Sequence, residues 1–326
     1  MTYRSFIYSV AIASMAGLAS PTLAETQTGP TVVTYQQVPD TYRFPLGKLN
    51  IVALSDGTVP QDLHQLLTHT KPADVDDLLG RSFLSNPVEA SINAYLIQDG
   101  ARRILVDTGS GQLFGPGYGG KLVDSLASVG TKPEDITDIL ITHIHTDHSG
   151  GLVADGRRVF PNAVVHVGKP DIDFFLDPSN AAKTGYAAKY FDEAAKTVGV
   201  YDKAGKVKPF TDGATILPGI VATIHQGHTP GSAFFTVTSE GRSIVFVGDI
   251  VHVAAVQFPN PEITIVYDLD ATKAAAVRET AFSKFADDRQ LIAAPHLPFP
   301  GVGHVNAKGH GTFGWFPVEY RNRAGQ

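Results

Sequence analysis

The chain has 326 residues, a formal net charge of −6 and no cysteine. The lack of cysteine excludes disulfides, thiolate nucleophiles and thiolate ligands, so any metal site must consist of histidine and carboxylate side chains. The negative charge disfavours polyanionic substrates such as nucleic acids. One basic run, Lys203, Lys206 and Lys208, fits a solvated turn better than a nucleic-acid surface.

The first 24 residues have the order of a secretory signal peptide. Arg4 lies in a short basic start, an apolar stretch covers about residues 6–18, and residues 22–24 form a small-residue cleavage site. The apolar stretch is shorter than the roughly 20 residues that a membrane-spanning helix needs. We therefore expect one domain over residues 25–326, located in the periplasm or secreted and without membrane contact. An uncleaved anchor is the alternative.

Apolar strand-like runs that end at turn residues recur along the first half of the chain. Their order predicts an antiparallel meander, then a helix and a short helical turn, then a strand that leads directly to His143. The expected strands are 51–54, 94–97, 104–106 and 139–142, the helix is 121–129, and the turn begins at Pro133.

The second half repeats this alternation of strands and helices. The expected strands are 163–167, 221–225, 233–238, 243–247 and 291–294, and the expected helices are 171–176, 187–198 and 271–285. Glu240 and Gly241 predict a hairpin turn. Two mixed sheets with helices outside them, in a four-layer α/β arrangement, account for this order.

A cluster of potential metal ligands follows the predicted strand 139–142. His143, His145, Asp147 and His148 lie within six residues. A loop at the end of a rigid strand can direct several successive side chains at one volume, which a helix cannot do. The pattern therefore predicts a metal-binding loop.

Three isolated residues at other predicted strand ends complete the candidate set. His228 lies in the segment 227–231, Asp249 ends the apolar run 245–248, and His296 follows the run that ends at Ala294. A carboxylate at the end of a buried strand is costly unless it is paired or metal-bound. We expect all three to join the ligands of the first loop.

These segments together resemble the ligand set of the metallo-β-lactamase superfamily, in the expected order along the chain. The resemblance implies the four-layer αβ/βα sandwich of that fold. It also implies two divalent metal ions, most simply zinc for nitrogen and oxygen ligands. The implied ligands are His143, His145 and His228 for one ion, Asp147, His148 and His296 for the other, and Asp249 as a bridge between them. Asp107 matches an early aspartate that is expected to orient a ligand histidine.

Four further segments, 49–59, 112–116, 253–258 and 299–304, resemble methyl parathion hydrolase and its relatives that cleave lactones and aryl esters. True β-lactamases of the best-known subclass use a cysteine ligand, so antibiotic hydrolysis is not expected. The resemblance implies a substrate pocket with aromatic walls and suggests a homodimer. The expected pocket residues are Phe114, Phe175, His252 and Phe258. Ordinary core packing is the alternative for the phenylalanines.

His252 lies three residues after Asp249, where acyl-homoserine lactone lactonases have a tyrosine. An imidazole there can donate a hydrogen bond or a proton to a leaving oxygen. We therefore expect Asp249 and His252 to act in catalysis. The alternative for His252 is a structural histidine held by hydrogen bonds near the metal ligands.

The expected reaction is hydrolysis by a hydroxide that bridges the two metal ions. Two ions bring the pKa of a bound water toward 7, and the hydroxide attacks a lactone or aryl-ester carbonyl or the phosphorus of a triester. The expected substrates are small and uncharged. One alternative is a thioester hydrolase of the glyoxalase II kind, disfavoured because the tail after His304 has only Lys308, Arg321 and Arg323. Another is a non-hydrolytic periplasmic metal-binding or di-iron protein.

The signal-peptide prediction has a direct test. Mass spectrometry of periplasmic material should give a mature chain that begins at Glu25, because cleavage after Ala24 fits the small-residue site. A protein that keeps Met1 and stays in the cytoplasm would contradict the prediction.

Overall fold

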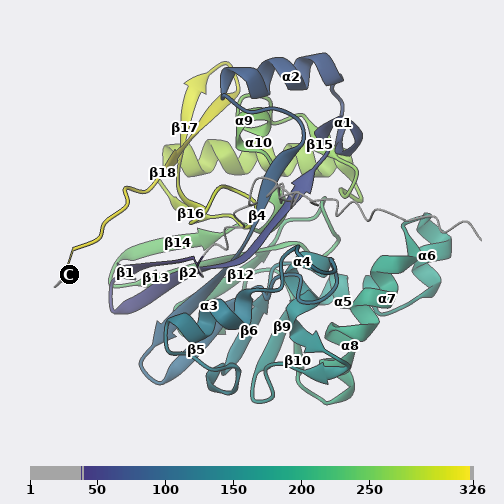
Figure 1. Ribbon diagram of the computed structural model, residues 1–326, viewed down its shortest axis with the longest axis vertical. Helices are drawn as coiled ribbons and strands as arrows, with labels where there is room; N and C mark the ends of the chain where they lie inside the picture. Colours follow the sequence, from purple (N-terminus) through teal and green to yellow (C-terminus); the bar gives the residue numbers. More distant parts are fainter. Residues whose placement is uncertain (1–37, 39, 324–326) are drawn as a thin grey trace, which may run out of the picture. The chain divides into compact units, whose positions relative to one another are not determined.

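Two seven-stranded mixed sheets pack against each other in the computed structural model, which describes residues 38 and 40–323 (Figure 1). The four-layer α/β fold expected from the sequence is confirmed. The expected signal peptide, residues 1–24, lies outside the described residues. No helix among the described residues is long and apolar enough to cross a membrane.

The first sheet has the strand order β1-β2-β4-β5-β6-β9-β10. Its first four strands pair antiparallel, which confirms the opening meander, and the remaining strands pair parallel. The strands are β1 (Thr41–Leu46), β2 (Leu49–Gln61), β4 (Val88–Asp99), β5 (Arg102–Val106), β6 (Asp138–Ile141), β9 (Val164–Gly168) and β10 (Val207–Phe210).

The second sheet has the order β11-β12-β13-β14-β16-β17-β18 and is antiparallel except between β14 and β16. The expected hairpin at Glu240 and Gly241 joins β13 to β14. The strands are β11 (Ala214–Leu217), β12 (Ile220–Ile224), β13 (Ala233–Ser239), β14 (Arg242–Phe246), β16 (Leu291–Ala293), β17 (Val302–Gly309) and β18 (Thr312–Pro317). The hairpin of β17 and β18 was not predicted, because that segment is rich in glycine.

Helices and two small strand pairs surround the sheets. The strand pairs are β3 (Leu67–Thr68) with β15 (Thr264–Ile265), and β7 (Val153–Ala154) with β8 (Arg157–Arg158). The α-helices are α1 (Leu63–Leu66), α2 (Pro72–Arg81), α3 (Leu122–Ser128), α4 (Thr146–Ser149), α5 (Lys169–Phe175), α6 (Ser179–Thr184), α7 (Ala188–Lys196), α8 (Val198–Lys203), α9 (Ala254–Gln257) and α10 (Ala271–Asp287). The 3-10 turns are η1 (Pro133–Asp135), η2 (Gly150–Leu152) and η3 (Gly248–Ile250).

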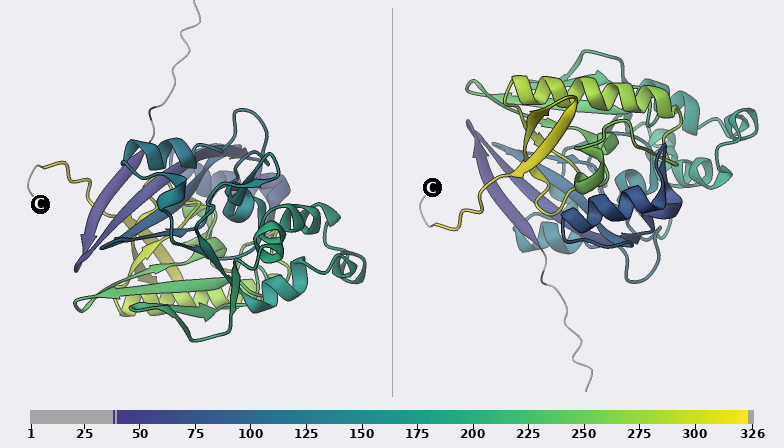
Figure 2. Two further views of the ribbon diagram at one scale, coloured as in Figure 1. Left: turned by 90° about the horizontal axis from the view of Figure 1, so that it is seen from below. Right: turned by 90° about the horizontal axis from the view of Figure 1, so that it is seen from above.

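Alternation along the strands explains the layers. In β2, Ile51 and Ala53 face the core between the sheets, whereas Val52 and Leu54 face the core under the helices of the first sheet. A separate core lies between the second sheet and α10. Figure 2 shows the two sheets between α3 on one side and the yellow-green α10 on the other.

The ends of parallel strands bring the candidate ligands to one edge of the molecule. β5 and β6 are parallel neighbours in the first sheet, and β14 and β16 are parallel neighbours in the second. Asp107 follows β5 and His143 follows β6, while Asp249 and His296 follow β14 and β16. Because the carboxyl ends of parallel neighbours meet at one edge, each sheet contributes part of the site.

Arg278 of α10 fixes the segments that surround this edge. Its side chain is fully buried and donates to the carbonyl oxygens of Ile250, Pro261 and Ile263 at 2.6–2.8 Å. One guanidinium nitrogen also lies 3.8 Å from the carboxylate of Asp268. A buried guanidinium with this many acceptors connects α10 to two loops of the second sheet.

We expect Arg278→Met to destabilise the fold by about 3–5 kcal/mol, because it removes the positive charge beside the buried Asp268 and the donor to the carbonyl oxygens of Ile250 and Pro261. The measurement is the urea midpoint and its slope at equilibrium. Glu279→Gln, at the neighbouring exposed position of α10, is the matched control and should unfold like the wild type. A loss below about 1 kcal/mol for Arg278→Met would show that the network contributes little.

Candidate metal centre

The loop after β6 is fixed by Asp107, which has a left-handed backbone with φ of 58°. Its carboxylate accepts hydrogen bonds from the backbone N–H and the hydroxyl of Thr142, both at 2.8 Å. The same carboxylate lies 2.9 Å from Nδ1 of His148. With Nδ1 held from behind, Nε2 of His148 faces the centre of the site. This is the contact expected of a residue that orients a ligand histidine.

Three histidines from two loops form the first cluster. Nδ1 of His145 lies 3.1 Å from Nε2 of His143 and 3.0 Å from Nε2 of His228. Two nitrogen ligands at 2.0–2.1 Å from a tetrahedral zinc ion lie about 3.3–3.4 Å apart. The three ring nitrogens are therefore close to the spacing that one such ion requires.

Two residues not identified from the sequence hold these rings. The hydroxyl of Tyr186 lies 2.8 Å from Nε2 of His145, and the carboxylate of Asp268 lies 2.7 Å from Nδ1 of His228. Each contact leaves the other ring nitrogen free to face the cluster. Neither residue had a sequence signal, because each comes from a segment 40 or more positions away from the histidine it contacts.

A second cluster contains Asp147, His148 and His296. Oδ1 of Asp147 lies 3.6 Å from Nε2 of His148, and Oδ2 of Asp147 lies 3.5 Å from Nε2 of His296. Nδ1 of His296 is 2.9 Å from the carbonyl oxygen of Ser91, which fixes the ring from behind. Asp147 and His148 lie in the one-turn helix α4 and not in an irregular loop.

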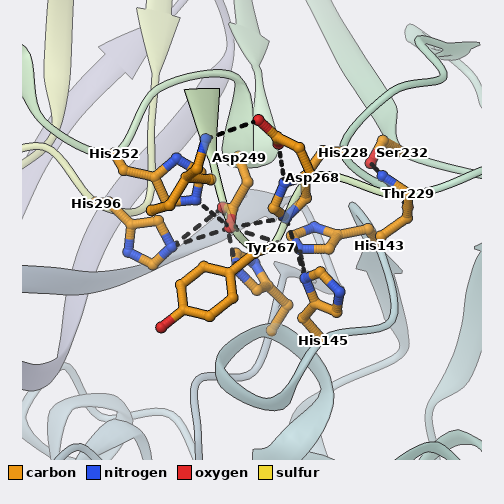
Figure 3. Close-up of polar contacts among 12 residues, drawn as sticks. His143, His145, His228, Thr229, Ser232, Asp249, His252, Tyr267, Asp268 and His296 are labelled. Carbon is orange, nitrogen blue, oxygen red and sulfur yellow. Dashed lines mark hydrogen bonds and ion pairs between the residues drawn. The ribbon is translucent and has the colours of Figure 1, made fainter. Parts of the chain in front are cut away.

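Asp249 contacts both clusters, and Figure 3 shows it between His296 and the histidines of the first cluster. Its Oδ1 is 3.1 Å from Nε2 of both His148 and His296, and its Oδ2 is 3.3 Å from Nε2 of His228 and 3.6 Å from that of His143. Oδ1 therefore faces the second cluster, and Oδ2 faces the first. His296 also contacts Oδ2 at 3.2 Å.

The turn that presents Asp249 needs a glycine before it. Gly248 has φ of 51°, and a Cβ there would lie 3.0 Å from Cβ of Thr142. A side chain at this position would push the loop after β14 away from the loop after β6.

The side chains present fit a pair of divalent ions. Nε2 of His148 and Oδ1 of Asp249 are buried and 3.1 Å apart, but the geometry of this contact is not that of a hydrogen bond, and neither atom has another hydrogen bond partner among the described residues. Buried polar atoms are rarely left in this state. The donor set of imidazole nitrogens and carboxylate oxygens is one that zinc and other divalent transition metals accept.

Burial and nearby opposite charges shift the pKa values of these side chains in opposite directions. Burial lowers the pKa of His143 and of His145 well below the usual range, so both rings are neutral, as a ligand must be. Burial also lowers the pKa of His228, but Asp249 and Asp268 raise it more, to about 9. Burial raises the pKa of Asp249, but the nearby His148 and His296 outweigh burial and hold it well below its ordinary value.

Asp171 joins the two loops that supply the first cluster. Its carboxylate accepts hydrogen bonds from the N–H of Ile144 at 2.9 Å, the hydroxyl of Thr229 at 2.9 Å and the N–H of Gly231 at 2.6 Å. A Cβ on Gly231 would lie 2.8 Å from that of Asp171, so only glycine allows this approach. Burial raises the pKa of Asp171 to about 6 despite the three donors.

A cavity of about 250 Å³ opens onto the clusters. Phe114 lines it, as expected, together with Tyr190 and Tyr267. Phe175 and Phe258 do not line it, contrary to expectation. Phe175 is buried in the core under the first sheet with its ring edge-on to His145, and Phe258 stacks between the rings of Phe282 and Trp315 in the core beside α10.

His252 also lines the cavity. Its Nε2 is 3.2 Å from Oδ2 of Asp249, and its Nδ1 is buried with no hydrogen bond partner among the described residues. Its backbone N–H donates to Oε1 of Gln257 at 2.7 Å, which fixes the residue. Burial lowers the pKa of His252, so the ring is neutral near pH 7. Asp249, His252 and His296 also lie close enough together to hold an ion.

Two solved structures cover most of this chain. The crystal structure of "hydrolase AbOPH in beta lactamase superfamily" matches with a TM-score of 0.83 at 36% identity, over 88% of this chain and 100% of that chain. AidC, described as a dizinc quorum-quenching lactonase in complex with a product, matches with a TM-score of 0.80 at 28% identity, over 88% and 100% of the two chains.

Curated relatives match over shorter segments. Ribonuclease TTHA0252 of Thermus thermophilus is 27% identical over 183 residues, which are 56% of this chain and 40% of that protein. The chain spans between 28% and 41% of the length of three such relatives.

The sequence model of the metallo-beta-lactamase superfamily matches residues 88–296, from the start of β4 to His296. This segment contains both clusters and Asp249. The chain therefore belongs to the metallo-beta-lactamase superfamily.

Proposed function

We propose that this chain is a binuclear metal-dependent hydrolase of small lactones or aryl esters, with related activity toward organophosphate triesters. The observation that carries the proposal is the position of Asp249, which directs one carboxylate oxygen at each of two histidine clusters. His143, His145 and His228 would hold one ion, Asp147, His148 and His296 the other, and Asp249 both. When bound, two such ions supply a hydroxide at neutral pH and Lewis acidity toward the attacked oxygen.

The substrate class rests on the cavity and on two likenesses. The cavity of about 250 Å³ suits a small molecule, and Phe114, Tyr190 and Tyr267 give it aromatic walls. AidC, 28% identical, is described as a dizinc lactonase, which favours zinc and lactones. The segments that resemble methyl parathion hydrolase favour aryl esters and triesters.

Polar residues of the chain line the cavity and can orient a substrate there. His145, Asp147, Asp249, His252 and His296 form the polar floor of the cavity. The neutral ring of His252 carries one N–H, either on Nε2, which lies 3.2 Å from Oδ2 of Asp249, or on Nδ1, which is buried without a hydrogen bond partner among the described residues. The nitrogen that carries the hydrogen is the one that can donate to a leaving oxygen.

A substrate screen separates the alternatives. Purified zinc-loaded protein should hydrolyse dihydrocoumarin, γ-lactones and p-nitrophenyl acetate, and methyl paraoxon more slowly. Exclusive activity on thioesters would favour the glyoxalase II-like alternative, and activity on RNA alone would favour a nuclease. No hydrolysis of any of these would favour a metal-binding or di-iron protein. We further propose that the protein is exported to the periplasm and forms a homodimer.

We predict two equivalents of divalent metal per chain. Asp249→Ala should lose both, because each ion then lacks a ligand, whereas Asp147→Ala should empty mainly the second position. Elemental analysis after gel filtration, paired with p-nitrophenyl acetate hydrolysis, measures both effects. Asp124→Ala, at an exposed position of α3, is the control. One tightly held equivalent in the wild type, with no gain in activity on adding metal, would refute the two-ion site.

We also predict that His252 assists departure of basic leaving groups. His252→Leu should slow γ-lactone hydrolysis, because loss of such a donor typically costs about 2.7–4 kcal/mol in the transition state. Paraoxon should be spared, since p-nitrophenolate needs little protonation. The measurement is kcat/KM for both substrates at matched metal content.

Two conservative variants identify the nitrogen that donates. The amide nitrogen of His252→Asn occupies nearly the place of Nδ1, and that of His252→Gln nearly the place of Nε2. Recovery of lactone hydrolysis by the Asn variant alone would support donation from Nδ1, and recovery by the Gln variant alone would support donation from Nε2. Equal losses on lactone and paraoxon in every variant would mean that His252 only supports the structure.

A further inference from the structure

Each histidine of the two clusters has a polar atom behind its ring. Carboxylates lie behind His148 and His228, and a backbone carbonyl oxygen lies behind His296. Such oxygens accept the N–H on their side of the ring and leave the other nitrogen to face the cluster. Behind His143 and His145 the partners are hydroxyl groups. A hydroxyl can donate or accept, so it does not by itself determine which ring nitrogen carries the hydrogen.

The hydroxyl behind His143 has its direction fixed by a carboxylate. Oγ1 of Thr142 lies 2.8 Å from Oδ2 of Asp107 and 3.1 Å from Nδ1 of His143. Since an ionised carboxylate only accepts, the hydroxyl hydrogen points at Asp107 and the hydroxyl oxygen accepts from Nδ1 of His143. Nε2 of His143 then carries no hydrogen on the side that faces the first cluster.

The hydroxyl behind His145 has the same arrangement, with a backbone carbonyl in place of the carboxylate. The hydroxyl of Tyr186 lies 2.8 Å from Nε2 of His145 and 3.3 Å from the carbonyl oxygen of Tyr267. Burial raises the pKa of Tyr186, so the hydroxyl keeps its one hydrogen. Because a carbonyl oxygen only accepts, this hydrogen points at Tyr267, and the hydroxyl oxygen accepts from Nε2 of His145. The opposite direction would place the ring hydrogen on Nδ1, which then could not bind an ion.

Packing and hydrogen bonds hold both ends of this chain of contacts. Tyr186 follows α6, and its ring packs on the core under the first sheet, with an edge contact to Phe175 at 6.3 Å between ring centroids. Tyr267 lies between β15 and α10, directly before Asp268, whose carboxylate is 2.7 Å from Nδ1 of His228. One short segment therefore lies behind two rings of the first cluster.

We propose that Tyr186 is a positioning residue that holds His145 in the tautomer with a free Nδ1 and so strengthens binding of a divalent ion to the first cluster. The carbonyl oxygen of Tyr267 sets the direction of the Tyr186 hydroxyl. This inference rests on the first metal position of the proposed function and not on the substrate. Partners that orient a ligand histidine typically change metal affinity by about ten- to a hundredfold.

The first test removes the hydroxyl and measures zinc binding without turnover. Tyr186→Phe keeps the ring, so the urea midpoint should stay close to that of the wild type, whereas zinc affinity at the first cluster should fall about ten- to a hundredfold. Competition with a chelator measures this affinity in the Asp147→Ala background, where mainly the first position should retain its ion.

Tyr190→Phe is the matched control for the loss of a hydroxyl. The ring of Tyr190 stacks on that of Tyr186 and lies 5.3 Å from that of His145, but among the described residues its hydroxyl has no hydrogen bond to either. Its zinc affinity in the same background should therefore equal that of the parent protein.

The second test identifies the tautomer directly. Nitrogen NMR of metal-free protein labelled at histidine distinguishes a ring nitrogen that carries hydrogen from one that does not, and His145→Gln identifies the signals. The wild type should carry the hydrogen on Nε2 of His145, and Tyr186→Phe should shift part of it to Nδ1. Any one of three results would overturn the inference: hydrogen on Nδ1 in the wild type, an unchanged tautomer in Tyr186→Phe, or unchanged zinc affinity in that variant.

Failure of this inference and failure of the proposed function give different results. A wild type that binds no zinc would refute the proposed metal centre, whereas the metal-free spectra would still show whether Tyr186 sets the tautomer. A wild type that binds two ions and hydrolyses esters, with Tyr186→Phe equal to it in tautomer and zinc affinity, would reject only the positioning role.

Discussion

The carboxylate of Asp249 is the group on which the rest of the site depends. It is buried where the ends of the two sheets meet, within 3.1–3.6 Å of ring nitrogens of His143, His148, His228, His252 and His296. A buried carboxylate is costly unless it is paired with positive charge. The divalent ions that we propose supply that charge, and without them it comes from His148, His228 and His296, whose pKa values burial lowers but the nearby carboxylates raise more. Loops from both sheets must therefore close around one negative group.

Three other buried carboxylates keep those loops in place. Asp107 holds His148 and the turn at Thr142, Asp268 holds His228, and Asp171 joins the loop after β6 to the loop before β13. Arg278 extends this support from Asp268 into α10. In each case a buried carboxylate accepts hydrogen bonds from backbone or ring N–H groups and so fixes the direction of a side chain. Because each support is buried, the site is shaped before any ligand enters.

Much of this could be predicted from the sequence, for a physical reason. Strands such as β6 and β14 have continuous apolar runs, and the polar residue at each end, His143 and Asp249, is costly in a core without a function. Tyr186 and Asp268 could not be identified, because their contacts join segments distant in sequence. Phe175 and Phe258 were wrongly predicted to line the pocket. The sequence places an aromatic residue near a site but does not show whether its ring points into the pocket or into the core. The position of His252 on the cavity agrees with the expectation, whereas its chemical role stays a prediction.

The two sheets share the candidate ligands between them, and this division would link the proposed metal binding to folding. His143 and His145 follow a strand of the first sheet, whereas His228 and His296 follow strands of the second. A ligand that binds only the folded chain stabilises it in proportion to the logarithm of its free concentration. Scarcity of metal in the surroundings would then lower the stability of the folded chain, and proteolysis would remove unfolded chains faster. The supply of metal would in this way set how long each molecule survives as well as how fast it works.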